Sequence, residues 1–289
     1  MKFTERALTF ACDSLERVGV LAEPENPAPV GVLVIVGGPQ YRAGSHRQFV
    51  LLGRALAAAG FPAMRFDSRG MGDSEGDALT FEESDADIAA AIERLLAECP
   101  GIDRVVLWGL CDAASAALMY CHARRDARVA GLVLLNPWVR SEASFAKTHI
   151  KHYYGKRLLD KAFWGKLFGG GVDIGRSLRD VVAAAARVAT RSGRRGDGVT
   201  VAFQRRMALG LESFPGQVLL VLSGRDLTAS EFLEYTQGDA MWRAALQRPN
   251  IRRHDIPDAD HTFSSAPWSR EVEVATLGLL VATDMAARR

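Results

Sequence analysis

Short apolar runs alternate with segments of helical spacing over the first half of the chain. Two runs near the start, 7–12 and 17–22, are separated by a polar turn and predict an antiparallel hairpin. The run Val30–Val36 is rich in β-branched residues and has no polar position, which is typical of a strand buried on both faces. The same patterns predict helices at 46–59, 82–99 and 112–124, and strands at 61–66, 104–110 and 129–135.

The alternation stops after residue 135 and returns at Gln217. The residues between are rich in aromatic side chains and contain the break Gly169–Gly171, so we expect a mostly helical insertion. Alternating strands and helices predict an α/β protein with a mostly parallel sheet and helices on both faces. Beyond the insertion we predict strands at 217–223 and 251–256, a helix near 238–246 and a final helix at 268–286. The expected core comprises 1–136 and 216–289, and the expected helical cap 137–215.

Composition narrows the class of protein. Hydrophobic residues make up 48% of the chain, and the formal net charge is only +2, so the overall charge does not indicate a nucleic-acid partner. No apolar run reaches the roughly 18–20 residues that a membrane-spanning helix needs, and the charged N-terminus lacks the apolar core of a signal peptide. The four cysteines have neither zinc-site nor disulfide-scaffold spacing. We therefore expect a cytoplasmic enzyme with a small-molecule substrate, no metal ion and no cofactor; the sequence is compatible with a homo-oligomer.

The segment Gly109–Ala113 lies between a buried predicted strand and a predicted helix. A nucleophile on a sharp strand-to-helix turn needs small residues two positions before and two after, usually in the pattern G-x-S-x-G. Gly109 and Ala113 meet this need, and Cys111 takes the place of serine. Alone the pattern is weak, because a buried and inert cysteine is the plainer alternative. The residues downstream decide between the two.

Two predicted strand ends downstream carry the partners that such a nucleophile requires. In a mostly parallel sheet, ligands meet the loops at the carboxyl ends of the strands. Asp226 follows the strand at 217–223 and His261 follows the strand at 251–256, which gives the chain order nucleophile, acid, histidine. We therefore predict Cys111, Asp226 and His261 as catalytic residues. Asp258 and Asp260 are rivals for the acid, but their closeness to His261 in sequence favours a role in shaping its loop.

The expected roles follow from charge. Only a thiolate attacks, so His261 would accept the thiol proton of Cys111 or pair with its thiolate. The N-terminus of the helix that begins at Asp112 adds positive potential at the thiol. Asp226 would orient the imidazole ring and stabilise its charged form.

An oxyanion hole requires two N–H donors near the nucleophile. The backbone amide of Asp112, directly after Cys111, is the first predicted donor. The second should come from the loop after the strand at 30–36, where we choose Gly38 because Pro39 has no N–H. Removing one such donor typically lowers the rate by about 10²–10³.

Two loops carry a specific resemblance. The segment 67–74 (D-S-R-G-M-G-D-S) resembles the D-x-R-G-x-G-x-S loop of α/β-hydrolases, where it buttresses the oxyanion side. Gly37-Gly38-Pro39 resembles their H-G-G-P loop, with Val36 in the place of histidine. Together with 109–113, the segment 38–49 is similar to the exosortase A system-associated hydrolases of type 1. This resemblance covers nearly the full chain and implies an α/β-hydrolase fold, but it carries over no substrate.

Basic side chains stand in two further places. Lys151, Lys156 and Arg157 of the expected cap fit either the solvated face of an amphipathic helix or a surface that attracts an anionic phosphopantetheine or CoA thioester. Arg42 and His46 lie near the predicted oxyanion loop, where we favour a structural role over contact with substrate.

These residues lead us to expect acyl transfer through a Cys111 acyl-enzyme. A thiol attacks activated acyl groups well, and the resulting thioester passes its acyl group to water, an alcohol or a thiol. A thioesterase or acyltransferase is therefore the first hypothesis, and a carboxylesterase or lactone hydrolase the second. A catalytically idle binding or scaffold protein is the third, and the presence of all three catalytic residue types argues against it.

Overall fold

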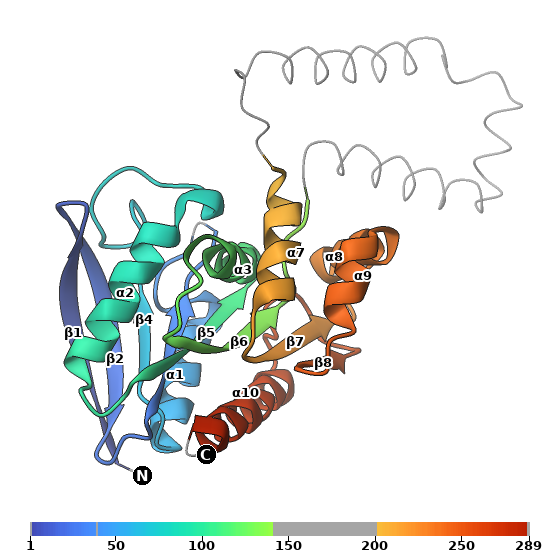
Figure 1. Ribbon diagram of the computed structural model, residues 1–289. Coiled ribbons are helices and arrows are strands. Elements are labelled where there is room, and N and C mark those ends of the chain that lie inside the picture. Colours follow the sequence, from blue (N-terminus) through green and yellow to red (C-terminus); the bar gives the residue numbers. More distant parts are fainter. Residues whose placement is uncertain (1, 39, 141–200, 288–289) are drawn as a thin grey trace, which may run out of the picture. The chain divides into compact units, whose positions relative to one another are not determined.

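A single twisted sheet organises the described part of the chain. The computed structural model describes residues 2–38, 40–140 and 201–287 (Figure 1). Within these residues, the strands pair in the order β1-β2-β4-β3-β5-β6-β7-β8. The pairs β1–β2 and β2–β4 are antiparallel and the other five are parallel, which confirms the predicted hairpin and mostly parallel sheet. The strands are β1 (Phe3–Cys12), β2 (Leu15–Pro24), β3 (Val30–Ile35), β4 (Ala63–Phe66), β5 (Arg104–Leu110), β6 (Val129–Leu135), β7 (Gln217–Ser223) and β8 (Ile251–Ile256).

Helices cover both faces of this sheet, as the alternation predicts (Figure 1). Side chains of α1 and α10 pack on one face, and those of α2, α3, α7, α8 and α9 pack on the other. The strand β3 shows why an uninterrupted apolar run is needed: Val32 and Val34 face the first layer, while Leu33 and Ile35 face the second. The helices are α1 (Gln48–Ala58), α2 (Asp85–Glu98), α3 (Asp112–Arg124), α7 (Phe203–Ser213), α8 (Leu227–Gly238), α9 (Ala240–Leu246) and α10 (Ala266–Ala287), with 3-10 turns η1 (Ser45–Arg47) and η2 (Phe81–Glu83).

The predicted helix near 238–246 is confirmed as α9. Gly238 ends α8, and α9 begins only after Asp239, whose side chain accepts a hydrogen bond of 3.0 Å from the amide of Trp242. The helix α8 was not predicted, although it buries Phe232 and Thr236, spaced by four residues, on one face. Its starting signal is the carboxylate of Asp226, which caps the helix by accepting a 3.0 Å hydrogen bond from the amide of Ala229.

Most of the expected cap, including Lys151, Lys156 and Arg157, lies outside the described residues. The described stretch 203–213 forms α7, which packs against α3 and α9. At the start of α7 the buried side chain of Gln204 donates a 3.0 Å hydrogen bond to the carbonyl of Val139. The described residues on either side of 141–200 are thus joined by a hydrogen bond.

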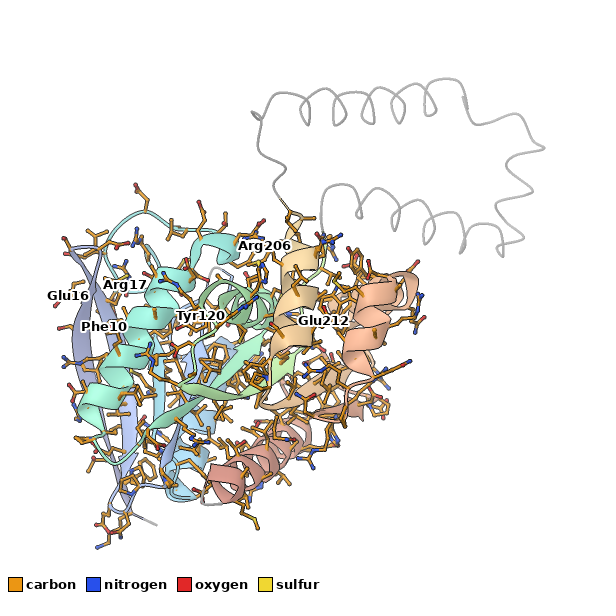
Figure 2. All side chains as sticks on the ribbon, viewed as in Figure 1. Phe10, Glu16, Arg17, Tyr120, Arg206 and Glu212 are labelled. Atoms are coloured by element: carbon orange, nitrogen blue, oxygen red, sulfur yellow. The ribbon has the colours of Figure 1, made fainter. Side chains whose placement is uncertain are left out.

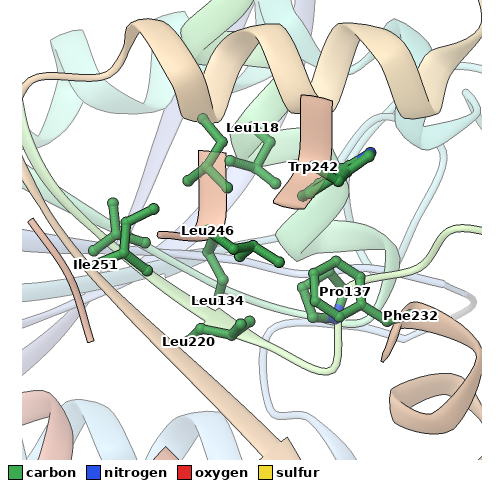
Figure 3. A pocket seen from close by; sticks show the side chains of 10 residues that line it. Leu118, Leu134, Pro137, Leu220, Phe232, Trp242, Leu246 and Ile251 are labelled. Carbon is green, nitrogen blue, oxygen red and sulfur yellow. The ribbon is translucent and has the colours of Figure 1, made fainter. Parts of the chain in front are cut away.

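Figure 2 labels Arg206, which projects from α7. Arg206 of α7 forms an ion pair with Glu82 of η2. Deeper in, a cavity of only about 10 Å³ lies between α3, α7, α9 and the strands β6 and β7 (Figure 3). Its lining is apolar, with Leu118, Leu134 and Trp242 among the contributors, so it offers a water molecule no polar partner. The side chains on this side of the sheet are closely packed around that small cavity. In the described part of the chain, no helix is long and apolar enough to cross a bilayer.

Candidate active site

Cys111 occupies a strained turn between β5 and α3. Its backbone has φ 62° and ψ −124°, a region that residues other than glycine rarely adopt and that costs roughly 1–3 kcal/mol. The Cys111 amide donates a 2.8 Å hydrogen bond to the carbonyl of Leu135 at the end of β6, which holds the turn in place. A Cβ atom on Gly109 would lie 2.6 Å from the backbone of Ala113, so only glycine fits there. The predicted sharp turn with small second neighbours is confirmed.

Exposure separates Cys111 from the other three cysteines. Cys12, Cys99 and Cys121 are buried, while Cys111 is partly exposed. Burial raises the pKa of Cys12, and it raises the pKa values of Cys99 and Cys121 to about 12. These three thiols therefore stay protonated near neutral pH and act as small apolar side chains. A soluble electrophile has direct access only to Cys111.

His261 and Asp226 meet at the carboxyl ends of β8 and β7. The ring Nδ1 of His261 lies 2.9 Å from Oδ2 of Asp226. Hydrogen bonding to Asp226, and then to the Cys111 side chain, raises the pKa of His261 to about 10 despite partial burial. The structure therefore brings together the three residues that the sequence selects: the ring bonds the acid on one side and reaches the thiol on the other.

The carboxyl group of Asp226 is held in its charged form. Burial works against the charge, but the hydrogen bond and charge of His261, together with the amides of Ala229 and Thr228, outweigh it and lower the pKa of Asp226. Only 8% of this side chain is exposed, against 35% for His261. The acid is thus fixed and enclosed, whereas the ring keeps an open side.

The two rival carboxylates are engaged elsewhere. Asp258 forms a 2.6 Å ion pair with Arg225 at the surface. Asp260 accepts hydrogen bonds from the amides of Thr262 and Ser264, at 3.1 and 3.0 Å, and so shapes the loop that carries His261. The predicted loop-shaping role is confirmed for Asp260.

Asn136 is a positioning residue that sequence reasoning missed. It is fully buried, and its side-chain amide donates to the hydroxyl of Ser223 at 2.8 Å and to the backbone carbonyl of His261 at 3.1 Å. Its side-chain oxygen accepts from the Ser223 amide at 2.9 Å. Asn136 therefore ties the ends of β6 and β7 to the histidine loop. Its signal in the sequence is a polar amide placed directly after an otherwise apolar strand.

The predicted oxyanion donors lie side by side. The amide of Gly38, just after β3, donates a 2.8 Å hydrogen bond to Oδ2 of Asp112. The amides of Ala113 and of Asp112 itself also donate to this carboxylate. Donors from two separate segments thus converge on one acceptor beside Cys111.

The segment 67–74 buttresses this side of the site. Asp67, fully buried, accepts hydrogen bonds from the amides of Arg42 at 2.6 Å and of Asp73 at 3.0 Å. The guanidinium of Arg42 forms ion pairs with the carboxylates of Asp67 and Asp73. Arg42 therefore has the structural role that we favoured, since it fastens the stretch after Gly38 to the segment 67–74. His46 is exposed on η1 and has a left-handed backbone.

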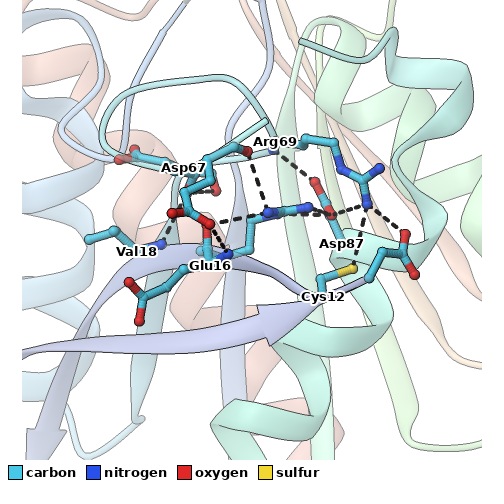
Figure 4. Close-up of polar contacts among 10 residues, drawn as sticks. Cys12, Glu16, Val18, Asp67, Arg69 and Asp87 are labelled. Atoms are coloured by element: carbon cyan, nitrogen blue, oxygen red, sulfur yellow. Dashed lines mark hydrogen bonds and ion pairs between the residues drawn. The ribbon is translucent and has the colours of Figure 1, made fainter. Parts of the chain in front are cut away.

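A buried ion pair between Arg17 and Asp87 anchors the segment 67–74 to the core (Figure 4). Arg17 of β2 and Asp87 of α2 lie 3.0 Å apart and are 0% and 2% exposed. The second oxygen of Asp87 accepts a 2.8 Å hydrogen bond from the amide of Arg69. The chain around Arg69 is thereby held to the core through a charged contact that water does not reach.

No group of three or more potential metal-ligating side chains gathers anywhere in the described ranges. The site is thus made of a thiol, an imidazole, a carboxylate and a set of backbone amides. Such a set supports nucleophilic attack on a carbonyl group and stabilisation of the oxygen that becomes negative.

Comparison with known proteins identifies the family of this fold. A model of the Alpha/beta hydrolase family matches residues 32–277. The chain belongs to the alpha/beta hydrolase family. Among curated proteins, none matches this alpha/beta hydrolase.

Several solved structures resemble the fold of this alpha/beta hydrolase. A Pyrococcus furiosus esterase has a TM-score of 0.65 at 14% identity, over 97% of this chain and 91% of that one. Est1E of Butyrivibrio proteoclasticus, with bound ferulic acid, has a TM-score of 0.59 at 15% identity, over 95% and 99%. A serine hydrolase without a lid from Xanthomonas campestris has a TM-score of 0.57 at 15% identity, over 96% and 95%. At these identities the likeness establishes the fold.

Proposed function

We propose that this protein is a thioesterase-like acyl hydrolase or acyltransferase that forms a Cys111 acyl-enzyme on an ester or thioester. The observation that carries the proposal is the position of His261, whose ring contacts both Asp226 and the Cys111 side chain. With a pKa of about 10, this ring is positively charged at neutral pH, so it carries a proton that it can give to a leaving group.

The proposed reaction has two halves. The Cys111 sulfur attacks the acyl carbon, and the carbonyl oxygen becomes an oxyanion that accepts from the amides of Gly38 and Asp112. The bond to the leaving group breaks, and His261 gives this group its proton. Water or another hydroxyl or thiol then loses a proton to His261 and attacks the thioester. This step releases the acyl product and regenerates the thiol–imidazole pair.

Cysteine at the turn favours activated acyl groups. A thiolate expels an alcohol or thiol leaving group readily, and its own acyl form is again a thioester that an acceptor can attack. We therefore rank thioesters first. A simple carboxylesterase or lactone hydrolase is the second candidate, supported by the esterases among the similar folds.

Two finer assignments accompany this proposal. The segments 38–49 and 109–113 support membership of the exosortase A system-associated hydrolases of type 1. The chain is further proposed to divide into a core of 1–136 and 216–289 and a helical cap insertion of 137–215. Of the insertion, the structure describes 137–140 and 201–215.

The test is the detection of the acyl-enzyme. The protein is incubated with octanoyl-CoA and with p-nitrophenyl esters, and its intact mass is measured. We expect one acyl adduct, which Cys111→Ala abolishes and the matched variant Cys121→Ala retains, because Cys121 is buried. Cys111→Ser should keep partial esterase activity if hydrolysis is the task. An adduct that persists in Cys111→Ala, or none with any substrate, contradicts the proposal and favours a scaffold.

A further inference from the structure

The side chain that follows the nucleophile occupies the place where an oxyanion would bind. The carboxylate of Asp112 accepts from the amide of Gly38 at 2.8 Å, and it also accepts from the amides of Ala113 and of Asp112 itself. In the proposed reaction, the amides of Gly38 and Asp112 have to donate to the substrate's carbonyl oxygen. In the free protein they already donate to a carboxylate of the chain's own.

The backbone beside Asp112 is shaped to admit this carboxylate. A Cβ atom on Gly37 would lie 2.0 Å from Oδ1 of Asp112 and 2.8 Å from the amide nitrogen of Ala113. Any side chain at Gly37 would therefore expel the carboxylate from its present position. Gly38 adopts φ +60°, a conformation that favours glycine, and its amide donates to Oδ2. Gly37 thus leaves space for the Asp112 carboxylate, and Gly38 provides the amide that donates to it.

A carbonyl oxygen competes poorly with this resident group. Hydrogen bonds to a charged acceptor are roughly twice as strong as those to a neutral one. Burial raises the pKa of Asp112, while the amides and the nearby charge of His261 offset part of that rise and favour the carboxylate. A small ester offers only its carbonyl oxygen in exchange. A larger substrate can contribute binding through its remaining groups, and that binding can be used to move the side chain.

We propose that Asp112 is a specificity-determining residue: its carboxylate fills the oxyanion hole of the free protein, and a substrate acylates Cys111 only if binding of the substrate's other groups displaces this carboxylate. This inference rests on the proposed Cys111 acyl-enzyme. The displacement breaks hydrogen bonds but no covalent bond, because rotation of the Asp112 side chain is enough to free the two amides. The favoured substrates are extended acyl thioesters and esters, and short acyl esters are discriminated against.

The experiment compares two p-nitrophenyl esters, the acetate and the octanoate. The selectivity is the ratio of the two kcat/KM values, measured for wild type, Asp112→Ala and Asp112→Asn. In Asp112→Ala the hole is free, so we expect acetate turnover to rise about 10- to 100-fold and the selectivity for octanoate to collapse. In Asp112→Asn the neutral amide oxygen still accepts from Gly38, but more weakly, so acetate turnover should rise less.

A matched control removes a carboxylate of similar chemistry elsewhere. Asp239 also accepts from an amide at the start of a helix, that of Trp242 at 3.0 Å. Asp239→Ala should lower the Tm of thermal unfolding slightly and leave the selectivity unchanged. If Asp112→Ala does not fold, the nearly isosteric Asp112→Asn decides by the same ratio.

Hydrogen exchange at the Gly38 amide gives a second readout. Loss of the acceptor in Asp112→Ala should speed the exchange of this amide, and an unchanged rate counts against the proposal. Acetate turnover that stays constant or falls in both folded variants overturns the inference, provided that octanoate still acylates Cys111. An absence of any Cys111 adduct in wild type and Asp112→Ala overturns the proposed function, and the inference with it.

Discussion

Two charged pairs of similar length differ in what surrounds them. Arg17 and Asp87 lie 3.0 Å apart and are almost completely enclosed. His261 and Asp226 lie 2.9 Å apart, but 35% of the histidine side chain is exposed. In the first pair, both carboxylate oxygens hold groups that fix the fold. In the second, the histidine also contacts the side chain of Cys111.

The difference teaches how a pair of charges becomes either structural or reactive. An enclosed pair cannot exchange a proton with a substrate, so its contribution lies in anchoring the segment 67–74 behind the oxyanion donors. The partly exposed pair holds the charged ring of His261 beside the thiol of Cys111, which substrates can reach. The distance within each pair does not separate the two roles. The exposure of the cationic side chain does, because Arg17 is enclosed and His261 is partly exposed.

We expect the largest effect from Asp226→Asn, which removes the charge from the partly exposed pair. An asparagine amide can donate to Nδ1 of His261 and favour the wrong tautomer, so we expect acylation to slow by about 10³–10⁴. Stability near neutral pH should fall through loss of the ion pair with His261, although asparagine still caps α8. Stopped-flow acylation with p-nitrophenyl octanoate measures the effect, with Asp258→Asn as the control. A rate within threefold of wild type (roughly 0.7 kcal/mol) would contradict the role of Asp226.

Arg17→Met breaks the enclosed pair. It leaves the buried Asp87 carboxylate with only the more distant guanidinium of Arg69, at 3.8 Å, so the free energy of unfolding should fall by up to about 3–5 kcal/mol. Arg225→Met is the matched variant, because Arg225 and Asp258 form an exposed pair at 2.6 Å and should contribute at most about 1 kcal/mol. Urea unfolding followed by circular dichroism compares the two. Equal losses would mean that enclosure makes no difference.

The smallest effect is a dependence of stability on pH. The pKa of His261 is raised from 6.5 to about 10 in the folded protein. Its protonated form therefore stabilises the fold fully below pH 6.5, and this contribution is lost as the pH rises through the folded value of about 10. We expect the Tm of wild type to fall more between pH 6.5 and 10 than that of Asp226→Asn, which lacks the main cause of the shift. Parallel curves would contradict the assignment.

The sheet and the order of catalytic residue types were predictable because they depend on local patterns. An apolar run such as Val30–Val36 records burial on both faces directly. The chain order of Cys111, Asp226 and His261 at strand ends follows from the topology of a parallel sheet. The helix α8 was missed because three of its five buried residues, Thr228, Glu231 and Thr236, are polar, so its apolar period is weak.

Contacts between distant segments were beyond reach. Asn136 and His261 are separated by 125 positions, and no local pattern records their hydrogen bond. The same holds for Gly38 and Asp112, which are 74 positions apart. The sequence predicted the Asp112 amide as a donor, but the acceptor that it meets is a side chain whose direction depends on the space left by Gly37.

The hydrogen bond between Gln204 and Val139 has a consequence for how such proteins diversify. It joins the described residues on either side of 141–200, so these two stretches are held together by a contact of their own. The free energy of closing a loop grows only slowly with its length. Changes in the length of the sequence between them should therefore cost the fold little free energy.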